Sequence, residues 1–297
     1  MEPTVRPVSL AAHDGHPLAG CHYDAPGRPI GAVVIAPAMA ITQSFYASFG
    51  RWLAGQGYAV RSFDYRGTGE SHRGRKRGAP GTLDDWCKRD YDAALAATHA
   101  EFPDLPLFAI GHSFGGQCAP LLPSRHLLAG LVNIAVGSGA MRDNTPAIGR
   151  IAPWLWYLLV PVLCPLFGYC PGGLIGVIGD VPTGAMRQWR RWCLSPDYLL
   201  GAEPGAREAY ASARFPVLAL TFADDELLLE SGSHRIHAAY APGQVDYRSI
   251  APATVGLERI GHAGFFRPLG EPRLWPQVKH WLDQRVAAAH AISPIPA

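Results

Sequence analysis

The chain has 297 residues, of which 48% are hydrophobic and 17% are charged, a composition typical of a folded globular protein. Its formal net charge of +2 gives no general reason to expect a nucleic acid as partner. The first residues lack a basic stretch followed by an apolar one, so we expect no secretory signal and a cytoplasmic location.

Six cysteines are spread along the chain without a C-x-x-C pair or a spacing typical of zinc ligands. They are Cys21, Cys87, Cys118, Cys164, Cys170 and Cys193. In the cytoplasm we expect reduced, mostly buried thiols, with a disulfide between Cys164 and Cys170 as the alternative. His13, His16 and His22 have no acidic or cysteine partner at a fitting spacing, so we expect solvated turn residues. We therefore predict no metal ion and no cofactor.

Three strands are predicted in the first part of the chain, at residues 5–12, 18–25 and 31–37. The pair Asp14-Gly15 between the first two is a hairpin signal. The third is a continuous apolar run, which suits a strand buried in the middle of a sheet. A helix is predicted over residues 45–57, because apolar side chains recur there at helical spacing.

The next predicted strand, residues 58–65, ends in a charged loop at 64–71 with the sequence DYRGTGES. Asp64 and Arg66 stand at the end of a buried strand, where a charge normally has to be paired. We therefore expect both to fix the loop rather than to act in catalysis. The basic run 73–77 is interpreted as a solvated loop, with binding of a phosphate or another acidic head group as the alternative.

A helix over residues 82–102, capped by Thr82, leads into an apolar strand at 107–112. This strand ends in Gly111-His112-Ser113-Phe114-Gly115, and the following residues suit another helix. A serine in such a sharp turn is lifted clear of the backbone, and the turn requires small residues on both sides of it. The first N–H groups of the helix then face whatever the serine attacks. The alternative is a chance G-x-S-x-G pattern in a glycine-rich chain.

The D-x-R-G-x-G-x-S loop and the G-x-S-x-G turn together resemble the α/β-hydrolase superfamily. Within it, the chain is similar to the serine-hydrolase branch that has lipase-like and aminopeptidase-like members. The alternation of strands and helices predicts a doubly wound, mostly parallel sheet, which this resemblance also implies. The resemblance further implies Ser113 as nucleophile and the backbone N–H groups of Phe114 and Met39 as the oxyanion hole. For the loop around Met39, a simple connection between strand and helix is the alternative.

The alternation breaks between residues 141 and 213, which we predict to be an inserted helical lid. Residues 1–140 and 214–297 would then form the hydrolase core. Residues 151–179 contain no charged side chain and are long enough to span a bilayer. Several prolines in this stretch argue against one continuous helix, so we expect short helices instead of a membrane span.

Aromatic residues of the predicted lid are candidates for substrate binding. Trp154, Trp156 and Phe167 would contribute to an apolar roof over the serine. Core packing of the lid is one alternative, and contact of the lid with a membrane surface is another.

A strand predicted at 216–222 ends in two adjacent carboxylates, Asp224 and Asp225. A carboxylate at this end of a strand is placed to orient an imidazole from another loop. In the resembling enzymes the acid is followed by one polar residue and an apolar pair. That pattern implies Asp225, with Asp224 as the alternative.

His262 lies between two glycines in the loop after the last predicted strand. The chain order Ser, Asp, His is the order of this superfamily's catalytic triad. His112 is the competing base. A side chain adjacent to Ser113 on a tight turn points away from it, so we expect His112 to have a packing role.

We therefore expect a cofactor-independent serine hydrolase for carboxylic esters or thioesters with a hydrophobic acyl part. Ser113 would be the nucleophile, His262 the general base and Asp225 the orienting acid. An acyltransferase or an aminopeptidase-like amidase would use the same triad. An alternative of another class is a non-catalytic module that binds a ligand or a membrane surface. We expect a small-molecule substrate and no nucleic acid partner, and the sequence does not determine the oligomeric state.

Overall fold

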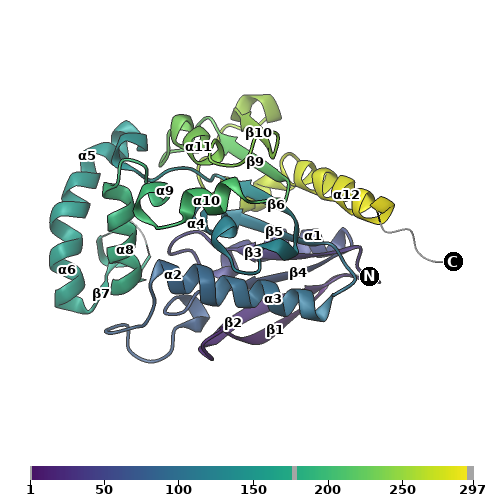
Figure 1. Ribbon diagram of the computed structural model, residues 1–297, viewed down its shortest axis with the longest axis horizontal. Coiled ribbons are helices and arrows are strands. Elements are labelled where there is room, and N and C mark those ends of the chain that lie inside the picture. The colour runs from purple at the N-terminus through teal and green to yellow at the C-terminus, as the bar shows by residue number, and fades with distance from the viewer. Residues whose placement is uncertain (1, 176–178, 293–297) are drawn as a thin grey trace.

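The centre of the computed structural model, which describes residues 2–175 and 179–292, is a sheet of eight strands (Figure 1). In spatial order they are β1 (Thr4–Ala11), β2 (Pro17–Asp24), β4 (Tyr58–Phe63), β3 (Gly31–Ala36), β5 (Leu107–His112), β6 (Leu128–Ile134), β9 (Val217–Phe222) and β10 (Val245–Ile250). Only the pairs that include β2 are antiparallel among these strands. The predicted doubly wound, mostly parallel sheet is confirmed.

Helices cover both faces of this sheet (Figure 1). The helices α1 (Ala47–Gly55) and α12 (Trp275–Ile292) pack on one face. The other face is covered by α2 (Leu83–Asp85), α3 (Asp92–Glu101), α4 (Phe114–Cys118), α10 (Ala206–Ala211) and α11 (Glu230–His237). A π-helical segment, Trp86–Tyr91, joins α2 to α3. The predicted cap of α2 is confirmed, because the Thr82 hydroxyl accepts from the Asp85 N–H at 3.1 Å.

The strand β3 illustrates why the central strands are continuous apolar runs. All of its residues are buried. Val33 and Ile35 lie in the core under α1 and α12, whereas Val34 and Ala36 lie in the core on the opposite face. Since both faces are covered, both sets of alternate side chains have to be apolar.

The turn after β5 depends on very close approaches between backbones. A Cβ atom on Gly115 would lie 2.2 Å from the Ala36 carbonyl oxygen. One on Gly111 would lie 2.3 Å from the Cα atom of Gly116. Any side chain at either position would therefore push α4 away from β3 and β5, which confirms that this turn requires small residues.

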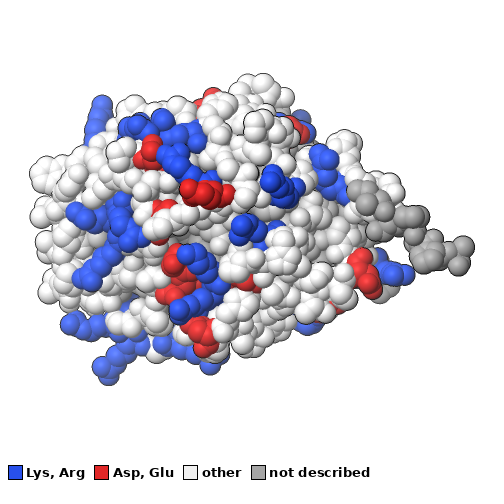
Figure 2. Space-filling model, viewed as in Figure 1, with Lys and Arg blue, Asp and Glu red and all other residues white. Residues whose placement is uncertain are grey.

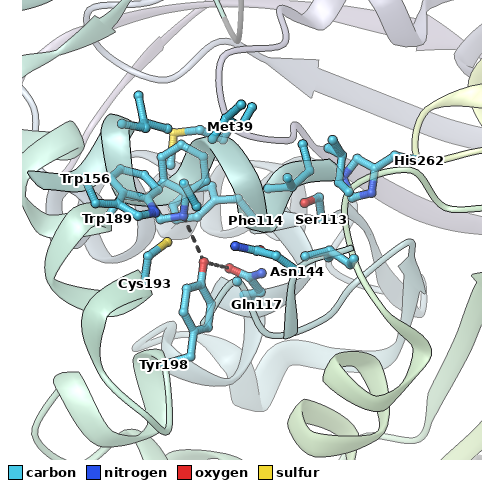
Figure 3. A pocket seen from close by; sticks show the side chains of 17 residues that line it. Met39, Ser113, Phe114, Gln117, Asn144, Trp156, Trp189, Cys193, Tyr198 and His262 are labelled. Carbon is cyan, nitrogen blue, oxygen red and sulfur yellow. Dashed lines mark hydrogen bonds between the residues drawn. The ribbon is translucent and has the colours of Figure 1, made fainter. Parts of the chain in front are cut away.

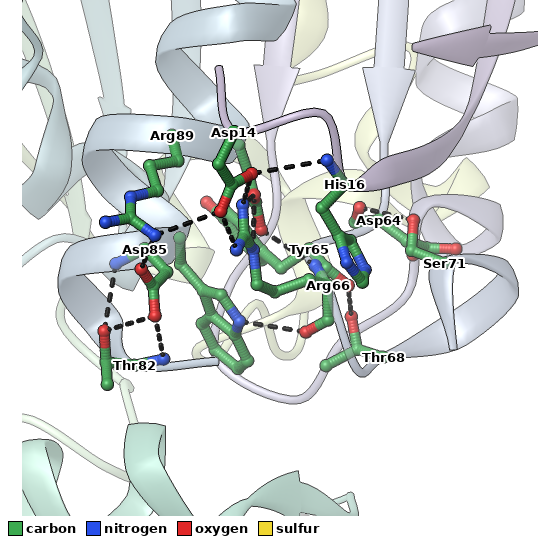
Figure 4. A network of polar contacts seen from close by, with 12 residues as sticks. Asp14, His16, Asp64, Tyr65, Arg66, Thr68, Ser71, Thr82, Asp85 and Arg89 are labelled. Carbon is green, nitrogen blue, oxygen red and sulfur yellow. Dashed lines mark hydrogen bonds and ion pairs between the residues drawn. The ribbon is translucent and has the colours of Figure 1, made fainter. Parts of the chain in front are cut away.

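Asp64 and Arg66 fix the loop after β4, as predicted (Figure 4). The buried Asp64 carboxylate accepts backbone N–H groups from Gln43 at 2.7 Å and from Glu70 at 2.9 Å. Burial raises the pKa of Asp64 to about 6. The Arg66 Nε donates to Asp90 at 2.8 Å, and its two terminal nitrogens donate to both oxygens of Asp14 at 2.7 and 2.9 Å. Each buried charge in this loop thus has partners.

The prediction that every cysteine is a free thiol is wrong for two of them. Cys87 and Cys118 form a disulfide, with Cα atoms 5.5 Å apart. It joins the π-helical segment before α3 to the last residue of α4, the helix that follows Ser113. Cys164 and Cys170 remain free. A separation of 31 residues gave no local signal for this pair.

The N-terminal histidines also differ from the prediction in part. His22 lies within β2 rather than in a turn, is fully buried, and stacks on the ring of Phe102. His13 is in the turn, but its Nε2 contacts the Asp92 carboxylate at 2.7 Å. The alternation of β2 points residue 22 into the protein, which the hairpin signal at Asp14 did not indicate.

Residues 141–213 form a group of helices between β6 and β9, which we call the cap; positions 176–178 of the predicted lid lie outside the described residues. Its helices are α5 (Pro146–Trp154), α6 (Val160–Phe167), α7 (Gly172–Ile175), α8 (Thr183–Leu194) and α9 (Leu199–Ala202), followed by α10. A short antiparallel pair, β7 (Tyr169–Cys170) and β8 (Val181–Pro182), lies among them. Figure 1 places α5, α6 and α8 together at the end of the molecule remote from α12.

Residues 151–179 do not form one continuous helix, as expected, because the helix that contains Ile151 ends at Phe167 and α7 begins at Gly172. The expectation of short helices is wrong up to Phe167. Pro146–Phe167 is one continuous helix of 22 residues, in which the π-helical turn Leu155–Leu159 joins α5 to α6. Pro153 and Pro161 lie on either side of this turn. A widened turn shifts the hydrogen-bonding pattern, which is how a helix can accommodate residues that lack an N–H group.

The start of the cap is attached to the loop after β9. Asn144 and Leu228 form an antiparallel bridge. The Thr145 hydroxyl donates to the Glu226 carbonyl oxygen at 2.8 Å. The cap therefore enters the fold beside the segment that carries Asp225.

We expect Gly115→Ala to lower the free energy of unfolding by about 3 kcal/mol, because its Cβ has no space against the Ala36 carbonyl. The matched control is Gly149→Ala in α5, where a Cβ atom meets nothing within 4 Å. That variant should be unchanged or more stable by up to about 1 kcal/mol. Urea unfolding followed by circular dichroism measures both, and equal stability of the two variants would contradict the packing argument.

Candidate active site

Ser113 occupies a strained backbone position between β5 and α4. Its φ and ψ angles are 49° and −115°. Its N–H donates to the Ile134 carbonyl oxygen at 2.9 Å, which fixes the turn to β6. A non-glycine residue in this conformation persists only where the surroundings impose it, and such residues cluster at functional sites. The geometry is that of the predicted nucleophile turn.

His262 and Asp225 are joined by a hydrogen bond. The Nδ1 atom of His262 lies 2.8 Å from Asp225 Oδ2, and both side chains are 8% exposed. The other carboxylate oxygen of Asp225 accepts the N–H groups of Leu227 at 2.8 Å and Leu228 at 3.1 Å. The carboxylate is therefore held on one side by backbone and presents the other side to the imidazole. This arrangement places the proton on Nδ1 and leaves Nε2 free to accept one.

Asp224 faces the backbone of the histidine loop instead of the imidazole. Its two oxygens accept the N–H groups of Ile260 at 2.8 Å and Gly261 at 3.1 Å. The Glu226 carboxylate accepts the N–H of His262 at 3.0 Å. Of the two aspartates left open by the sequence, Asp225 contacts the ring and Asp224 positions the loop that carries it.

His112 is buried beside Ser113 and is hydrogen-bonded through both ring nitrogens. Its Nδ1 lies 2.9 Å from the Tyr46 hydroxyl, and its Nε2 lies 2.9 Å from the His262 carbonyl oxygen. Since a carbonyl can only accept, the proton is on Nε2. The Tyr46 hydroxyl then donates to Nδ1 and accepts the Ala38 N–H at 2.8 Å. His112 thus joins the strand end before Met39 to the loop that carries His262, and its packing role is confirmed.

The backbone N–H groups of Phe114 and Met39, predicted as the oxyanion hole, lie in residues that line the pocket with Ser113. Phe114 opens α4, so its N–H has no acceptor inside the helix. Within residues 2–175 and 179–292, the N–H of Met39 makes no hydrogen bond. Both residues line the same pocket as Ser113. Ala40, next to Met39, has a φ angle of 60°, so the backbone turns sharply at this loop.

A largely apolar pocket connects the cap to the site (Figure 3). Its wall includes Ser113 and His262 from the core, and Ile151, Leu155, Trp156, Trp189 and Cys193 from the cap. Figure 3 shows Ser113 beside His262 on one side and the two tryptophans across the pocket. In the described part of the chain, no hydrogen bond joins the Ser113 hydroxyl to the imidazole. Such contacts often form only when substrate is bound.

The three aromatic residues predicted to bind substrate have different positions. Trp156 is buried and lines the pocket. Trp154 is 67% exposed and points away from the pocket, because residues two apart lie on nearly opposite faces of a helix. Phe167 lies at the end of α6, where its ring contacts Tyr169 rather than the pocket. The prediction is therefore wrong for Trp154 and Phe167.

Three hydrogen-bonded side chains in the wall of the pocket were not predicted from the sequence. The Trp189 Nε1 donates to the Tyr198 hydroxyl at 3.1 Å, which donates to Gln117 Oε1 at 3.2 Å. Tyr198 has a φ angle of 53°, a strained value for a tyrosine. Asn144 also lines the pocket. The single usable signal in the sequence was the position of Gln117 one helical turn after Ser113.

Comparisons with known proteins agree with this geometry. Residues 27–168, just under half of the chain, match the sequence model of a family described as serine aminopeptidase, S33. A soluble variant of monoglyceride lipase from Saccharomyces cerevisiae, solved with a substrate analog, has a TM-score of 0.69 at 16% identity and covers 96% of both chains. A thermostable carboxyl esterase from Bacillus coagulans, solved with glycerol, has a TM-score of 0.64 at 12% identity, over 95% of this chain and 99% of that one.

A Pyrococcus furiosus esterase is similar as well, with a TM-score of 0.61 at 14% identity, over 95% of this chain and 90% of that one. No curated protein matches the chain in sequence. At these identities the structural likeness shows the fold. The chain has the α/β-hydrolase fold.

We expect His112 to make stability depend on pH. Burial, with a smaller effect of His262, lowers the pKa of His112 from 6.5 to about 3. Between these values the unfolded chain binds a proton at residue 112 that the folded chain does not, so stability falls as the pH falls. Gln at this position keeps a donor and an acceptor but does not titrate. Urea unfolding from pH 7 to pH 4 should give a shallower loss for His112→Gln than for wild type, and equal slopes would contradict this.

Proposed function

We propose that the protein is a serine hydrolase that cleaves carboxylic esters with a hydrophobic acyl part. The observation that carries the proposal is that His262, hydrogen-bonded to Asp225, lines one pocket with the strained Ser113. A buried carboxylate that orients an imidazole beside a serine at a helix start is the arrangement of a charge-stabilised general base and its nucleophile.

In the acylation half-reaction, Ser113 Oγ attacks the ester carbonyl carbon while His262 Nε2 takes the hydroxyl proton. The carbonyl oxygen becomes an oxyanion, which the N–H groups of Phe114 and Met39 stabilise. Asp225 stabilises the imidazolium through its bond to Nδ1. The carbon–oxygen bond to the leaving alcohol then breaks, and His262 gives its proton to that alcohol.

In the deacylation half-reaction, a water molecule loses a proton to His262 Nε2 and attacks the acyl carbon. The same N–H groups stabilise the second oxyanion. When it collapses, the bond to Ser113 Oγ breaks and the proton on His262 returns to the serine. The products are the carboxylic acid and the free enzyme, and the cycle needs no redox or group-carrying cofactor.

The lining of the pocket supports the choice of acyl group. The cap side is formed by Ile148, Ile151, Leu155 and Trp156. An acyl chain buried against these side chains contributes about 0.8 kcal/mol per methylene. The monoglyceride lipase and the esterases with this fold act, by their names, on esters.

Amide hydrolysis is the second candidate, because the matched family is described as a serine aminopeptidase. The same triad chemistry applies to an amide, whose leaving amine takes the proton from His262. A thioester would react in the same way. Nitrophenyl esters of increasing chain length, acyl thioesters and aminoacyl amides, assayed side by side, separate these candidates. Faster turnover of aminoacyl amides than of esters would favour the peptidase.

We expect Ser113→Ala to fold normally and to lose roughly five to six orders of magnitude in kcat. A fluorophosphonate probe should label wild type and not this variant. The matched control is Ser212→Ala, at an exposed serine outside the pocket, which should keep full activity and labelling. Wild-type turnover by Ser113→Ala would reject the mechanism.

Asp225→Asn and Asp224→Asn separate the two carboxylates. Asparagine at 225 favours the wrong tautomer of His262, and we expect kcat to fall by about 10⁴-fold. Asparagine at 224 weakens only the backbone contacts of Ile260 and Gly261, so a loss of about tenfold is expected. Steady-state kinetics on a short nitrophenyl ester measures both. A larger loss at 224 than at 225 would reverse the assignment.

A further inference from the structure

The helix Pro146–Phe167 has an apolar face that is exposed among the residues the structure describes. It is the one helix in residues 2–175 and 179–292 that is long and apolar enough to cross a membrane, with a mean hydropathy of 1.5, and 28% of that apolar window is buried. Ala152, Trp156, Val160 and Cys164 form the buried face, packed within the protein. Because this face is part of the cap and of the pocket wall, the helix is held against the core rather than free to span a bilayer.

The opposite face is apolar or aromatic at every exposed position from 151 to 166. These positions are Ile151, Pro153, Trp154, Tyr157, Leu158, Pro161, Val162, Pro165 and Leu166, which we call the apolar stripe. Trp154, Tyr157 and Leu166 are 67%, 63% and 62% exposed. The spacing of three to four residues keeps the stripe on one side of the helix over about 24 Å. Soluble monomers rarely expose such a continuous surface unless it binds something.

Positive charge borders the apolar stripe. Arg150 is the sole charged residue of the helix and is exposed. The Arg190 guanidinium lies 5.8 Å from the ring of Tyr157, and Arg77 Nη1 donates to the Leu166 carbonyl oxygen at 3.0 Å. Arg77 belongs to the basic run 73–77, which is thereby attached to the end of α6. In the view of Figure 2, Lys and Arg predominate over Asp and Glu at the end of the molecule formed by α5, α6 and α8.

We propose that the apolar stripe docks parallel to the surface of a bilayer that contains anionic phospholipids. Leu158, Val162 and Leu166 would enter the boundary between head groups and acyl chains, where Trp154 and Tyr157 are also favoured. The bordering arginines pair with lipid phosphates, each contributing an attraction of about 1 kcal/mol near the surface. The complementary charge favours a lipid surface over a second copy of this chain, which carries the same positive border.

Docking in this orientation places the pocket next to the lipid. Ile151 belongs both to the apolar stripe and to the pocket wall, and Leu155 lies one turn further inside. A lipid-soluble ester could therefore reach Ser113 along the same helix. Docking itself does not rest on the proposed function, because none of the contacts to lipid involves the triad.

The test is flotation of the full chain with vesicles of phosphatidylcholine, with and without phosphatidylglycerol. We expect wild type to float with the anionic vesicles and to be released by high salt, because surface charge attraction is screened. Partitioning of the protein onto the anionic vesicles should fall by about tenfold or more in a triple variant, Trp154→Ser/Leu158→Ser/Leu166→Ser. The matched control is Leu269→Ser, at a leucine that is 53% exposed on the core, which should float like wild type.

Arg150→Gln should weaken binding to anionic vesicles by roughly fivefold and leave binding to neutral vesicles unchanged. Circular dichroism and turnover of a short soluble ester check that the variants fold. Ser113→Ala should float like wild type, because the serine does not contact lipid. If wild type and every variant lacked ester activity, the proposed function would be rejected and the docking proposal would stand. Absence of flotation, equal flotation of the triple variant, or a dimer that the triple variant abolishes would each overturn docking.

Discussion

The packing of α4 against β3 and β5 is the constraint on which the site depends. Because Gly111 and Gly115 have no side chain, α4 begins very close to the sheet. Ser113, midway between the two glycines, adopts a φ of 49° there. This strain is maintained because the Ser113 N–H is bonded to β6. Ser113 therefore takes its position from backbone packing, and its side chain remains available for the proposed chemistry.

Segments far apart in the sequence are held around this turn by polar groups that do not react. Asp224 and Glu226 bind the backbone of the loop at His262, and His112 binds its carbonyl oxygen. Asp64 fixes the loop after β4 by two N–H groups. These partners bind main chain, whereas the Asp225 carboxylate contacts the imidazole ring of His262. These contacts hold the backbone of the site in place without a substrate, which is what the proposed oxyanion hole and base require.

Features of the fold that depend on a few adjacent residues could be predicted from the sequence. The central strands are apolar on both faces, and the turn at Ser113 needs glycines, so both could be predicted from a few adjacent residues. The orientation of side chains in the cap could not be predicted, since the face on which Trp154 or Trp156 lies depends on the exact phase of a helix that was predicted to be broken. The pairing of Cys87 with Cys118 depends on the approach of two helices. The helix α11 is short and polar, and gave no apolar periodicity to recognise.

The attachment of Asn144 and Thr145 to the loop after β9 has a mechanical consequence. The first residues of the cap are bonded to the same loop that carries Asp225. Moving these residues away from the loop would therefore pull Asp225 out of alignment with the imidazole of His262. Entry of a bulky molecule should therefore displace parts of the cap other than this attachment. The attachment would keep Asp225 aligned with the imidazole of His262 while the rest of the cap moves.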